Sequence, residues 1–483
     1  MNSVISYLIY FLFFLVFTLA PIDIALNIKI SGFNLRSGLL AMVILTVLLG
    51  TVIAKDILLK KQKLTLPLYL ILLLILAVIN LLFVPNSVYI PRGLVYALTL
   101  LLFVFLISFS VNTREYISLE KIVDIYVFSF LLHALLGAVQ FILFYGFGIN
   151  FFMMQLGRIN GLTYEPSYYV THLVPGTILI TLMALFLNEK RGRIIFYSLT
   201  ASLMLLILIF STSKLGIVES VTVILLAILV GVFLKLFKVL KEVNLKRNVS
   251  YFVAFTVFFA AIFYVSGNIG SIVNFLFPGK GEERISHLEK TEVEERISHL
   301  EKIEVEERIS QLEKTEGEER ISHLEKTKEV LASSKETSFD IRLSQFKETL
   351  EIALENPLLG KSLGGVAPYR ALKNGMNPEN NDDVKQFEGI NIFAEMLAGF
   401  GIIGFLLMLG FIILISYDGV RLGIKALASN YKVSIILIGL VLGFLLELFF
   451  LMFNQNVLRL YLWNHITLLA LAIEKARYEY TSD

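Results

Sequence analysis

The feature that most constrains the fold of this chain is a series of apolar segments, each about as long as a membrane is thick. A transmembrane helix needs about 20 apolar residues, and 56% of this chain is hydrophobic while only 17% is charged. The mean hydropathy of +0.75 is far from that of an ordinary soluble domain. We predict spans over residues 4–22, 37–54, 66–84, 91–110, 122–145, 166–187, 194–211, 215–234, 249–266, 389–415, 434–453 and 457–473. The sequence therefore predicts an all-α polytopic membrane protein with about 12 transmembrane helices.

One long polar stretch, residues 267–388, interrupts this series. It separates nine predicted spans in residues 1–266 from the last three in residues 389–483. Within it, residues 282–329 are four copies of a twelve-residue unit that begins EERIS. Twelve residues advance a helix by about 1200°, so the apolar positions rotate around the axis and form no coiled-coil seam. We interpret the repeats as a solvated spacer, followed by an amphipathic helix near residues 340–355.

Lysine and arginine mark alternate short loops, and such loops normally stay in the cytoplasm. Basic residues follow the second, sixth, eighth, tenth and twelfth predicted spans: Lys55, Lys60, Lys61, Lys63, Lys190, Arg191, Arg193, Lys235, Lys238, Lys241, Lys246, Arg247, Arg421, Lys425, Lys432, Lys475 and Arg477. Both termini are therefore predicted to be cytoplasmic, and the long loop is predicted to be external. Its acidity does not oppose this placement, because long loops cross membranes largely regardless of charge.

The residue types argue against a metal centre. The chain contains no cysteine, which excludes disulfides and thiolate metal sites. His287, His299 and His323 recur only because the repeat recurs, and Gln311 takes the equivalent position in the third copy. We expect no cofactor and no metal.

Charged residues at the predicted external ends of the spans are the candidates for a functional site. Arg158 and Glu165 lie in RINGLTYEPSYYVTHLVPG, residues 158–176, just before the sixth span. Arg342 begins the predicted amphipathic helix, and Gly360, Gly364 and Gly365 allow a close backbone turn after it. Arg342 could equally be a structural arginine that caps or pairs locally.

Lys214 stands in the turn between the seventh and eighth spans, close to Glu219. Ionisable groups at membrane depth are costly and usually face a polar interior or a partner. These two residues could therefore belong to a site or could form a buried pair. Glu447 and Arg459 could line a polar interior, although Arg459 could instead reach out to the surface. We interpret the histidines inside spans as satisfied interior residues: His133, His172 and His465.

Several of these segments, in this order, resemble the O-antigen polymerase and ligase superfamily of bacterial envelope polysaccharide assembly. The resemblance covers roughly residues 150–220 and 339–410. Its residues are an Arg followed by Gly and Glu-Pro-Ser, a Ser-x-Ser-basic turn, an Arg before Asn-Pro-Leu-Leu-Gly, and Asn-x-Phe-x-Glu before Gly-x-x-Gly: Arg158, Gly161, Glu165, Pro166, Ser167, Ser211 to Lys214, Arg342, Asn356 to Gly360, Asn391, Phe393, Glu395, Gly401 and Gly404.

The resemblance implies a helical fold similar to the C-type glycosyltransferases in the bacterial cytoplasmic membrane, with an external active site. A His normally precedes the Asn in the ligase branch, whereas Ile390 stands here. This departure favours a polymerase, which in this family transfers the growing glycan from undecaprenyl pyrophosphate onto the next lipid-linked repeat unit without nucleotide sugar or essential metal. The expected partners are this lipid-linked oligosaccharide, the bilayer and a chain-length regulator, with no nucleic acid.

The chemistry of this reaction assigns roles to the candidates. Arginine suits bidentate contacts to phosphate, so we expect Arg158 and Arg342, with Lys214, to bind the pyrophosphate. A carboxylate must accept the proton of the acceptor hydroxyl; Glu165 is the first candidate for this base. Glu395 is the second, unless it bonds Asn391 or a helix end. The motif tyrosines could stack on sugar rings, but an interfacial aromatic belt is the favoured interpretation: Tyr164, Tyr168 and Tyr169.

Three other functions compete with a polymerase. An O-antigen ligase would use the same fold and the same donor. A polysaccharide-precursor transporter or flippase would also suit twelve spans with both termini inside, but it predicts related halves with charged positions near the bilayer midplane, and the sequence shows no convincing half-to-half repeat. A scaffold that binds a partner through the repeats would leave Arg158 and Arg342 without a role.

Overall fold

The structure is a computed structural model. It describes residues 3–30, 33–60, 64–82, 90–155, 157–211, 213–237, 243–266, 338–362, 364–380, 383–384, 387–388, 391–453 and 457–480. The repeats at 282–329, Ile390 and Thr212 lie outside the described residues. The chain divides into two compact units, residues 1–267 with 345–483 and residues 268–344. The first unit contains almost all of the described helices.

The described chain is predominantly helical. The helices that coincide with predicted spans are α1 (Ser3–Leu19), α2 (Ser37–Lys60), α3 (Leu68–Leu82), α4 (Ile90–Asn112), α5 (Leu119–Phe141), α6 (Pro166–Phe186), α7 (Arg191–Phe210), α8 (Lys214–Leu236), α9 (Leu245–Ser266), α16 (Ile392–Ala426), α17 (Tyr431–Leu451) and α18 (Leu460–Tyr480). The other described helices are a π-helix continuing α5, η2 (Ile142–Gly146), α13 (Ser338–Glu355) and α14 (Val366–Lys373). One antiparallel hairpin, β1 (Asn27–Ile30) and β2 (Phe33–Arg36), joins α1 to α2.

The prediction of an all-α polytopic membrane protein is confirmed. Nine helices in the described part of the chain are long and apolar enough to cross a membrane, and α1 and α3 are shorter apolar helices. The last predicted span falls on α18, which is outside those nine and has Glu474, Lys475 and Arg477 near its end. The hairpin β1–β2 was not predicted.

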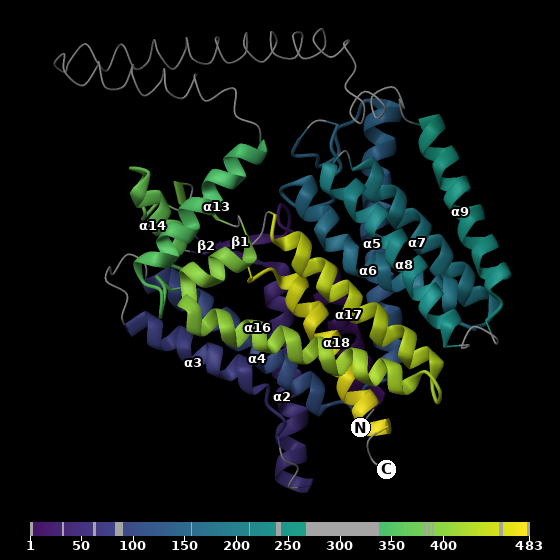
Figure 1. Ribbon diagram of the computed structural model, residues 1–483, viewed down its shortest axis with the longest axis horizontal. Coiled ribbons are helices and arrows are strands. Elements are labelled where there is room, and N and C mark those ends of the chain that lie inside the picture. The colour runs from purple at the N-terminus through teal and green to yellow at the C-terminus, as the bar shows by residue number, and fades with distance from the viewer. Residues whose placement is uncertain are drawn as a thin grey trace. The chain divides into compact units, whose positions relative to one another are not determined.

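Helix α6 is the most deeply buried of the nine membrane-span candidates. It packs against α17, α7 and α8, and 94% of its span is buried, compared with 11% for α9. Close approach to α17 requires small residues, because a side chain at Gly439 or Gly443 would meet Leu179 or Pro175 of α6. Figure 1 shows α9 at one edge of these helices. The residues that begin α6 are therefore held by neighbours on several sides.

Helix α16 is interrupted near its start, six residues after the candidate Glu395. Gly401 has φ 65° and ψ −170°, so the helix is interrupted there. The turn Asn356 to Lys361 fills the break: the Lys361 amide donates to the Ala398 carbonyl, and the Ile402 amide donates to the Pro357 carbonyl, both at 2.8 Å. The break is thus satisfied by another segment rather than left open in the membrane.

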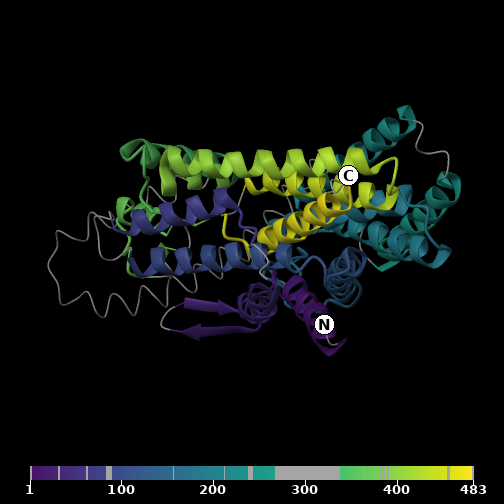
Figure 2. The same cartoon turned by 90° about the horizontal axis from the view of Figure 1, so that it is seen from below.

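Helix α3 fixes this break from the opposite side. The buried Asn80 amide group donates to the carbonyls of Leu359, at 2.6 Å, and Gly399, at 3.3 Å. Figure 2 shows α3 running alongside α16. Gly360 has φ +72° and lies against the Gly399 backbone, while Gly364 lies against Arg92 and Gly93 at the start of α4. The close turn predicted for these glycines is present.

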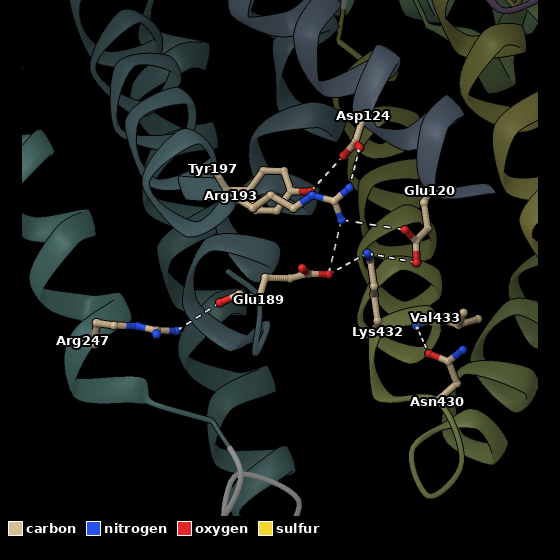
Figure 3. A network of polar contacts seen from close by, with 9 residues as sticks. All are labelled: Glu120, Asp124, Glu189, Arg193, Tyr197, Arg247, Asn430, Lys432 and Val433. Carbon is tan, nitrogen blue, oxygen red and sulfur yellow. Dashed lines mark hydrogen bonds and ion pairs between the residues drawn. The ribbon is translucent and has the colours of Figure 1, made fainter. Parts of the chain in front are cut away.

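A charged network ties together helix ends at the other end of α6 (Figure 3). The Lys432 ammonium contacts Glu189 at 2.6 Å and Glu120 at 3.0 Å, and Arg193 contacts Glu189 at 3.5 Å and Asp124 at 3.4 Å. Although burial acts against it, the contact with Lys432 holds the pKa of Glu189 below its usual value. Glu120, Glu189 with Arg193, and Lys432 come from three of the loops that we predict to be cytoplasmic, so the network gathers those loops at one end.

Candidate functional site

The segment before α6 is held in shape by its glycines and by Gln140. Gly157 and Gly161 adopt positive φ, and the Gln140 side chain both donates to the Gly161 carbonyl at 2.7 Å and accepts from its amide at 2.9 Å. Pro166 then opens α6, where a residue without an amide hydrogen is tolerated. This arrangement places Arg158 and Glu165 in a defined loop.

Arg158 and Glu165 are both half-buried, and each makes a local contact. Arg158 donates to the Gln155 side chain at 2.5 Å. Glu165 precedes the first residue of α6, but its carboxylate accepts from the Ser167 hydroxyl at 2.9 Å instead of capping the helix. No contact between these two residues and Lys214 is present in the described structure.

Lys214 and Glu219 do not form the buried pair that was one of the two interpretations. Lys214 is exposed at the first position of α8, whereas Glu219 is fully buried and lies 3.5 Å from the Thr171 hydroxyl of α6. Five positions separate them in one helix, so their side chains leave its axis in different directions. That interpretation is wrong for this pair.

Arg342 belongs to the second unit, at residues 268–344, and its side chain is half-buried in α13. Arg158 belongs to the first unit. The expectation that Arg158 and Arg342 together bind pyrophosphate therefore stays a prediction.

Glu395 lies in the first turn of α16 amid positive charge. Its side chain is buried, with 7% exposed, and its carboxylate is within electrostatic reach of Arg459, Arg92 and Arg370. Asn391 caps α16 by accepting hydrogen bonds from the amides of Phe393 and Ala394. The Glu395 side chain therefore neither bonds Asn391 nor caps the helix. Its Oε2 atom has no hydrogen-bond partner among the described residues.

Each of the three arginines around Glu395 is bound by its own carboxylate. Arg92 pairs with Glu388, and Arg370, which is 1% exposed, donates to Glu348 at 2.8 and 3.0 Å. The carboxylates come from separate parts of the chain: Glu388 from the segment before α16, Glu348 from α13 and Asp23 from the connection after α1. Each of the three arginines thus has a carboxylate other than Glu395 to orient it.

Arg459 is buried between the connection after α1 and the start of α6. Its guanidinium lies 3.2 Å from Asp23 and 4.4 Å from the centre of the Tyr168 ring. Because its residue exposure is only 8%, it does not reach out to the surface. The polar-interior interpretation of Arg459 is confirmed.

The motif tyrosines do not form an aromatic belt. Tyr169 is buried, and its hydroxyl donates to the His133 carbonyl at 2.6 Å. Tyr168 faces Arg459, and only Tyr164 is exposed. The tyrosines instead fix the start of α6 and one arginine, which contradicts the belt interpretation for two of the three.

The interior histidines differ in how they are satisfied. His465 contacts the Tyr126 hydroxyl at 2.7 Å and the Leu440 carbonyl at 2.8 Å. His172 packs against the rings of Phe130 and Tyr461, and neither of its nitrogens has a hydrogen-bond partner among the described residues. The interpretation as a satisfied histidine therefore holds for His465 and fails for His172.

Sequence reasoning missed Asp23, Arg92 and Arg370. Arg92 and Asp23 lie at span ends that we placed on the external side, and this position could have identified them as candidates. However, no motif marks either residue. Arg370 lies in a helix of eight residues within the long polar stretch, where charge is common. No group of three or more His, Cys, Asp or Glu side chains in the described residues could hold a metal ion.

Comparison with known families gives one match. The family model described as O-Antigen ligase matches residues 176–409, which include Lys214, Arg342, Arg370 and Glu395. No curated protein matches the chain. The matched region extends from α6 through the break in α16, so it contains the helix start that carries Glu395. This match supports the O-antigen polymerase and ligase superfamily over residues 176–409. Together with the apolar helices, it points to a multi-pass protein of the bacterial cytoplasmic membrane.

Proposed function

We propose that the chain is a glycan polymerase that transfers a growing polysaccharide from undecaprenyl pyrophosphate onto the next lipid-linked repeat unit. The observation that carries the proposal is Glu395, a buried carboxylate with three arginines in electrostatic reach, within the part of the chain that matches the O-antigen ligase family. An acid–base group beside fixed positive charge is the combination that transfer from a diphosphate requires.

The arginines address the charge that develops on the leaving group. When the bond between the sugar and the pyrophosphate breaks, the electron pair stays with the lipid diphosphate, so its negative charge grows in the transition state. Fixed cations in a partly water-excluded site stabilise such charge most strongly. We assign this role to Arg92, Arg370 and Arg459 and retain Arg158, Arg342 and Lys214 as proposed ligands of the same diphosphate.

Glu395 is the proposed general base. The acceptor hydroxyl of the incoming repeat unit loses its proton as it attacks the sugar, and a carboxylate can accept that proton. Glu165 remains the alternative, although its carboxylate already accepts a hydrogen bond from Ser167. The Oε2 atom of Glu395 has no such partner among the described residues, which favours Glu395.

We place this chemistry on the external face of the membrane, with both termini in the cytoplasm. Support comes from the charged network at the other end of α6, which gathers Glu120, Glu189, Arg193 and Lys432. These residues lie at or beside the loops that the distribution of lysine and arginine assigns to the cytoplasm. Glu165 and Glu189 lie at opposite ends of α6, so the Glu395 end would be external.

Ile390 favours a polymerase over the alternative, an O-antigen ligase. The ligase branch that this chain resembles normally carries a His at the position of Ile390. Isoleucine cannot exchange a proton or donate a hydrogen bond. A ligase would therefore need another residue in that role.

The test is to incubate the full chain, reconstituted in vesicles, with lipid-pyrophosphate-linked repeat units from its own host and to separate the products by length. We expect a ladder of polymers. Transfer of a single unit to another acceptor, supplied in parallel, would assign a ligase. Intact substrate that appears on the other side of the vesicle membrane, without new products, would assign a transporter.

We expect Arg158→Ala and Arg342→Ala each to lower the rate of chain growth by about 10² to 10³, as is usual when one preorganised donor to a developing charge is lost. Both variants should insert and fold, because neither side chain is fully buried. The measurement is the polymer ladder at equal amounts of folded protein. A variant that produces the ladder of the unmodified protein would remove its arginine from the diphosphate site.

A further inference from the structure

Asp23 lies where the connection after α1 meets the candidate site. It is buried, with 3% exposed, and its carboxylate contacts two arginines, Arg459 at 3.2 Å and Arg36 of β2 at 2.9 Å. The Asp23 carboxylate therefore holds Arg459 and strand β2 together.

The backbone at Asp23 is fixed to the segment that precedes α6. The amides of Asp23 and Ile24 both donate to the Leu162 carbonyl, at 2.9 and 3.1 Å. Leu162 lies between Arg158 and Glu165, the two motif residues before α6. The position of the Asp23 carboxylate is therefore set by the motif loop, and any movement of that loop would move it.

Arg459 is held on two sides by these elements. Asp23 contacts its Nη1 atom at 3.2 Å, and its Cζ atom lies over the Tyr168 ring, 4.4 Å from the ring centre. Its Nε atom is buried and has no acceptor among the described residues. Buried donors usually have an acceptor, and an oxygen of an anionic ligand is the acceptor that suits an arginine N–H group.

Burying the charged pair Asp23 and Arg459 costs free energy, so stability alone does not explain the pair. Removing charged groups from water costs several kcal/mol per ion, and buried pairs often add no net stability. Asp23 and Arg459 are separated by 436 positions in sequence, so the contact also requires the first connection and the last helix to meet. A fixed orientation of Arg459 relative to Glu395, which is within its electrostatic reach, is what the contact provides.

We infer that Asp23 is a positioning residue: it holds the Arg459 guanidinium in the orientation that binds the leaving diphosphate beside Glu395. This inference rests on the proposed function. Asp23 itself touches no substrate and exchanges no proton in the reaction. Its contribution is made through Arg459, since a guanidinium that is displaced by about 1 Å can cost a factor of about 10² in rate.

A double-mutant cycle tests the inference by kinetics. Asp23→Asn should lower kcat/KM for the lipid-linked donor by about 10 to 10², and Arg459→Gln by about 10² to 10³. If Asp23 acts through Arg459, the double variant should be no slower than Arg459→Gln alone. Asp23→Glu should restore part of the rate. Losses that multiply in the double variant would overturn the inference.

A second measurement does not depend on activity. An arginine-selective glyoxal reagent, followed by mass spectrometry of the full chain in detergent, reports how accessible Arg459 is with and without inorganic pyrophosphate. We expect Asp23→Asn to raise the labelling of Arg459 several-fold and to weaken the protection given by pyrophosphate. Unchanged labelling and protection in Asp23→Asn would overturn the inference.

Asp56→Asn is the matched control, because it also removes a buried aspartate that is held by a hydrogen bond, here from Tyr116 at 2.6 Å. This variant should leave the labelling of Arg459 unchanged. If Asp56→Asn raised that labelling as much as Asp23→Asn does, the effect would reflect a general loss of stability and would overturn the inference. Absence of polymer from the unmodified protein would refute the proposed function, while the labelling would still decide whether Asp23 positions Arg459.

Discussion

Glu395→Gln should reduce the rate of chain growth by a factor of about 10² to 10⁴, the usual contribution of a general base. Glutamine has nearly the same shape but cannot accept the proton of the acceptor hydroxyl. The substitution should not disturb the fold, because Asn391, and not Glu395, caps α16. The measurement is the initial rate of polymer formation by the reconstituted protein, with circular dichroism and thermal melting to confirm folding.

Two further variants make this result specific. Glu351→Gln changes an exposed glutamate of α13 and should leave the rate unchanged. Glu165→Gln should have the smaller effect if Glu395 is the base. The reverse order, with Glu165→Gln inactive and Glu395→Gln active, would transfer the role of base to Glu165 and leave Glu395 as a counter-ion of the arginines.

Gly360→Ala should destabilise the protein by about 4 kcal/mol or more, a loss that is exceptional for one substitution. Gly360 has φ +72°, and an added Cβ would lie 2.5 Å from the carbonyl carbon of Gly399. The obstacle is backbone, so no side chain can turn aside. The turn would be pushed out of the break in α16, and the hydrogen bonds of Lys361 and Ile402 across it would be lost.

Gly375→Ala is the control for the backbone conformation alone. Gly375 has the same φ of +72°, but nothing lies within 4 Å of an added Cβ. Its cost should be that of a left-handed residue without a clash, about 1–2 kcal/mol. Thermal melting of both variants in detergent measures the difference. Equal losses of stability would mean that the turn does not need its close approach to α16.

Acid should weaken the contact between α13 and α14. A hydrogen bond from Tyr369, together with Lys361 and Lys373, lowers the pKa of Glu355 to about 2 from its usual 4.5. A carboxylate with a lowered pKa stabilises the folded state above pH 4.5, and this contribution disappears as the pH falls toward 2. Comparing the unmodified protein with Glu355→Gln isolates the contribution of this carboxylate. The two proteins should differ in their free energy of unfolding by only about 1 kcal/mol at pH 6, because Glu355 is partly exposed.

That difference should shrink steadily between about pH 5 and pH 2. Thermal melting at a series of pH values measures it, and using the difference between the two proteins cancels the titration of other carboxylates. A constant difference over this range would show that Glu355 is not held in its charged form by Tyr369 and the two lysines.

Hydropathy predicted the helices well for a physical reason. In a membrane each backbone amide needs a hydrogen-bond partner from the protein, and a helix supplies it within the same segment, so a long apolar stretch usually forms a helix. The close turn at Gly360 was also predictable, because Asn-Pro ends a helix and glycine permits a tight approach. The break at Gly401 was not, because it is stabilised by hydrogen bonds from a different segment.

The site itself was less predictable than the fold. Glu395 was identified as a candidate, whereas Arg459 was assigned only to a polar interior or to the surface. Their electrostatic interaction depends on how α16, α18 and the connection after α1 pack together. Arg92, Arg370 and Asp23 became candidates only through contacts with residues remote in sequence. Tyr168 illustrates the limit: its sequence position suits a membrane interface, and its actual partner is an arginine 291 positions away, from residue 168 to residue 459.

The contact between Asp23 and Arg459 has a consequence for biosynthesis. Asp23 follows α1 and Arg459 precedes α18, so Asp23 is synthesised long before its partner. A nascent chain that has inserted α1 to α17 therefore carries Glu395 but no oriented Arg459. We expect such a chain to be inert toward lipid-linked sugars, so that activity begins only when α18 has joined its neighbours. Premature termination before residue 459 would then yield inactive protein and no unregulated glycan transfer.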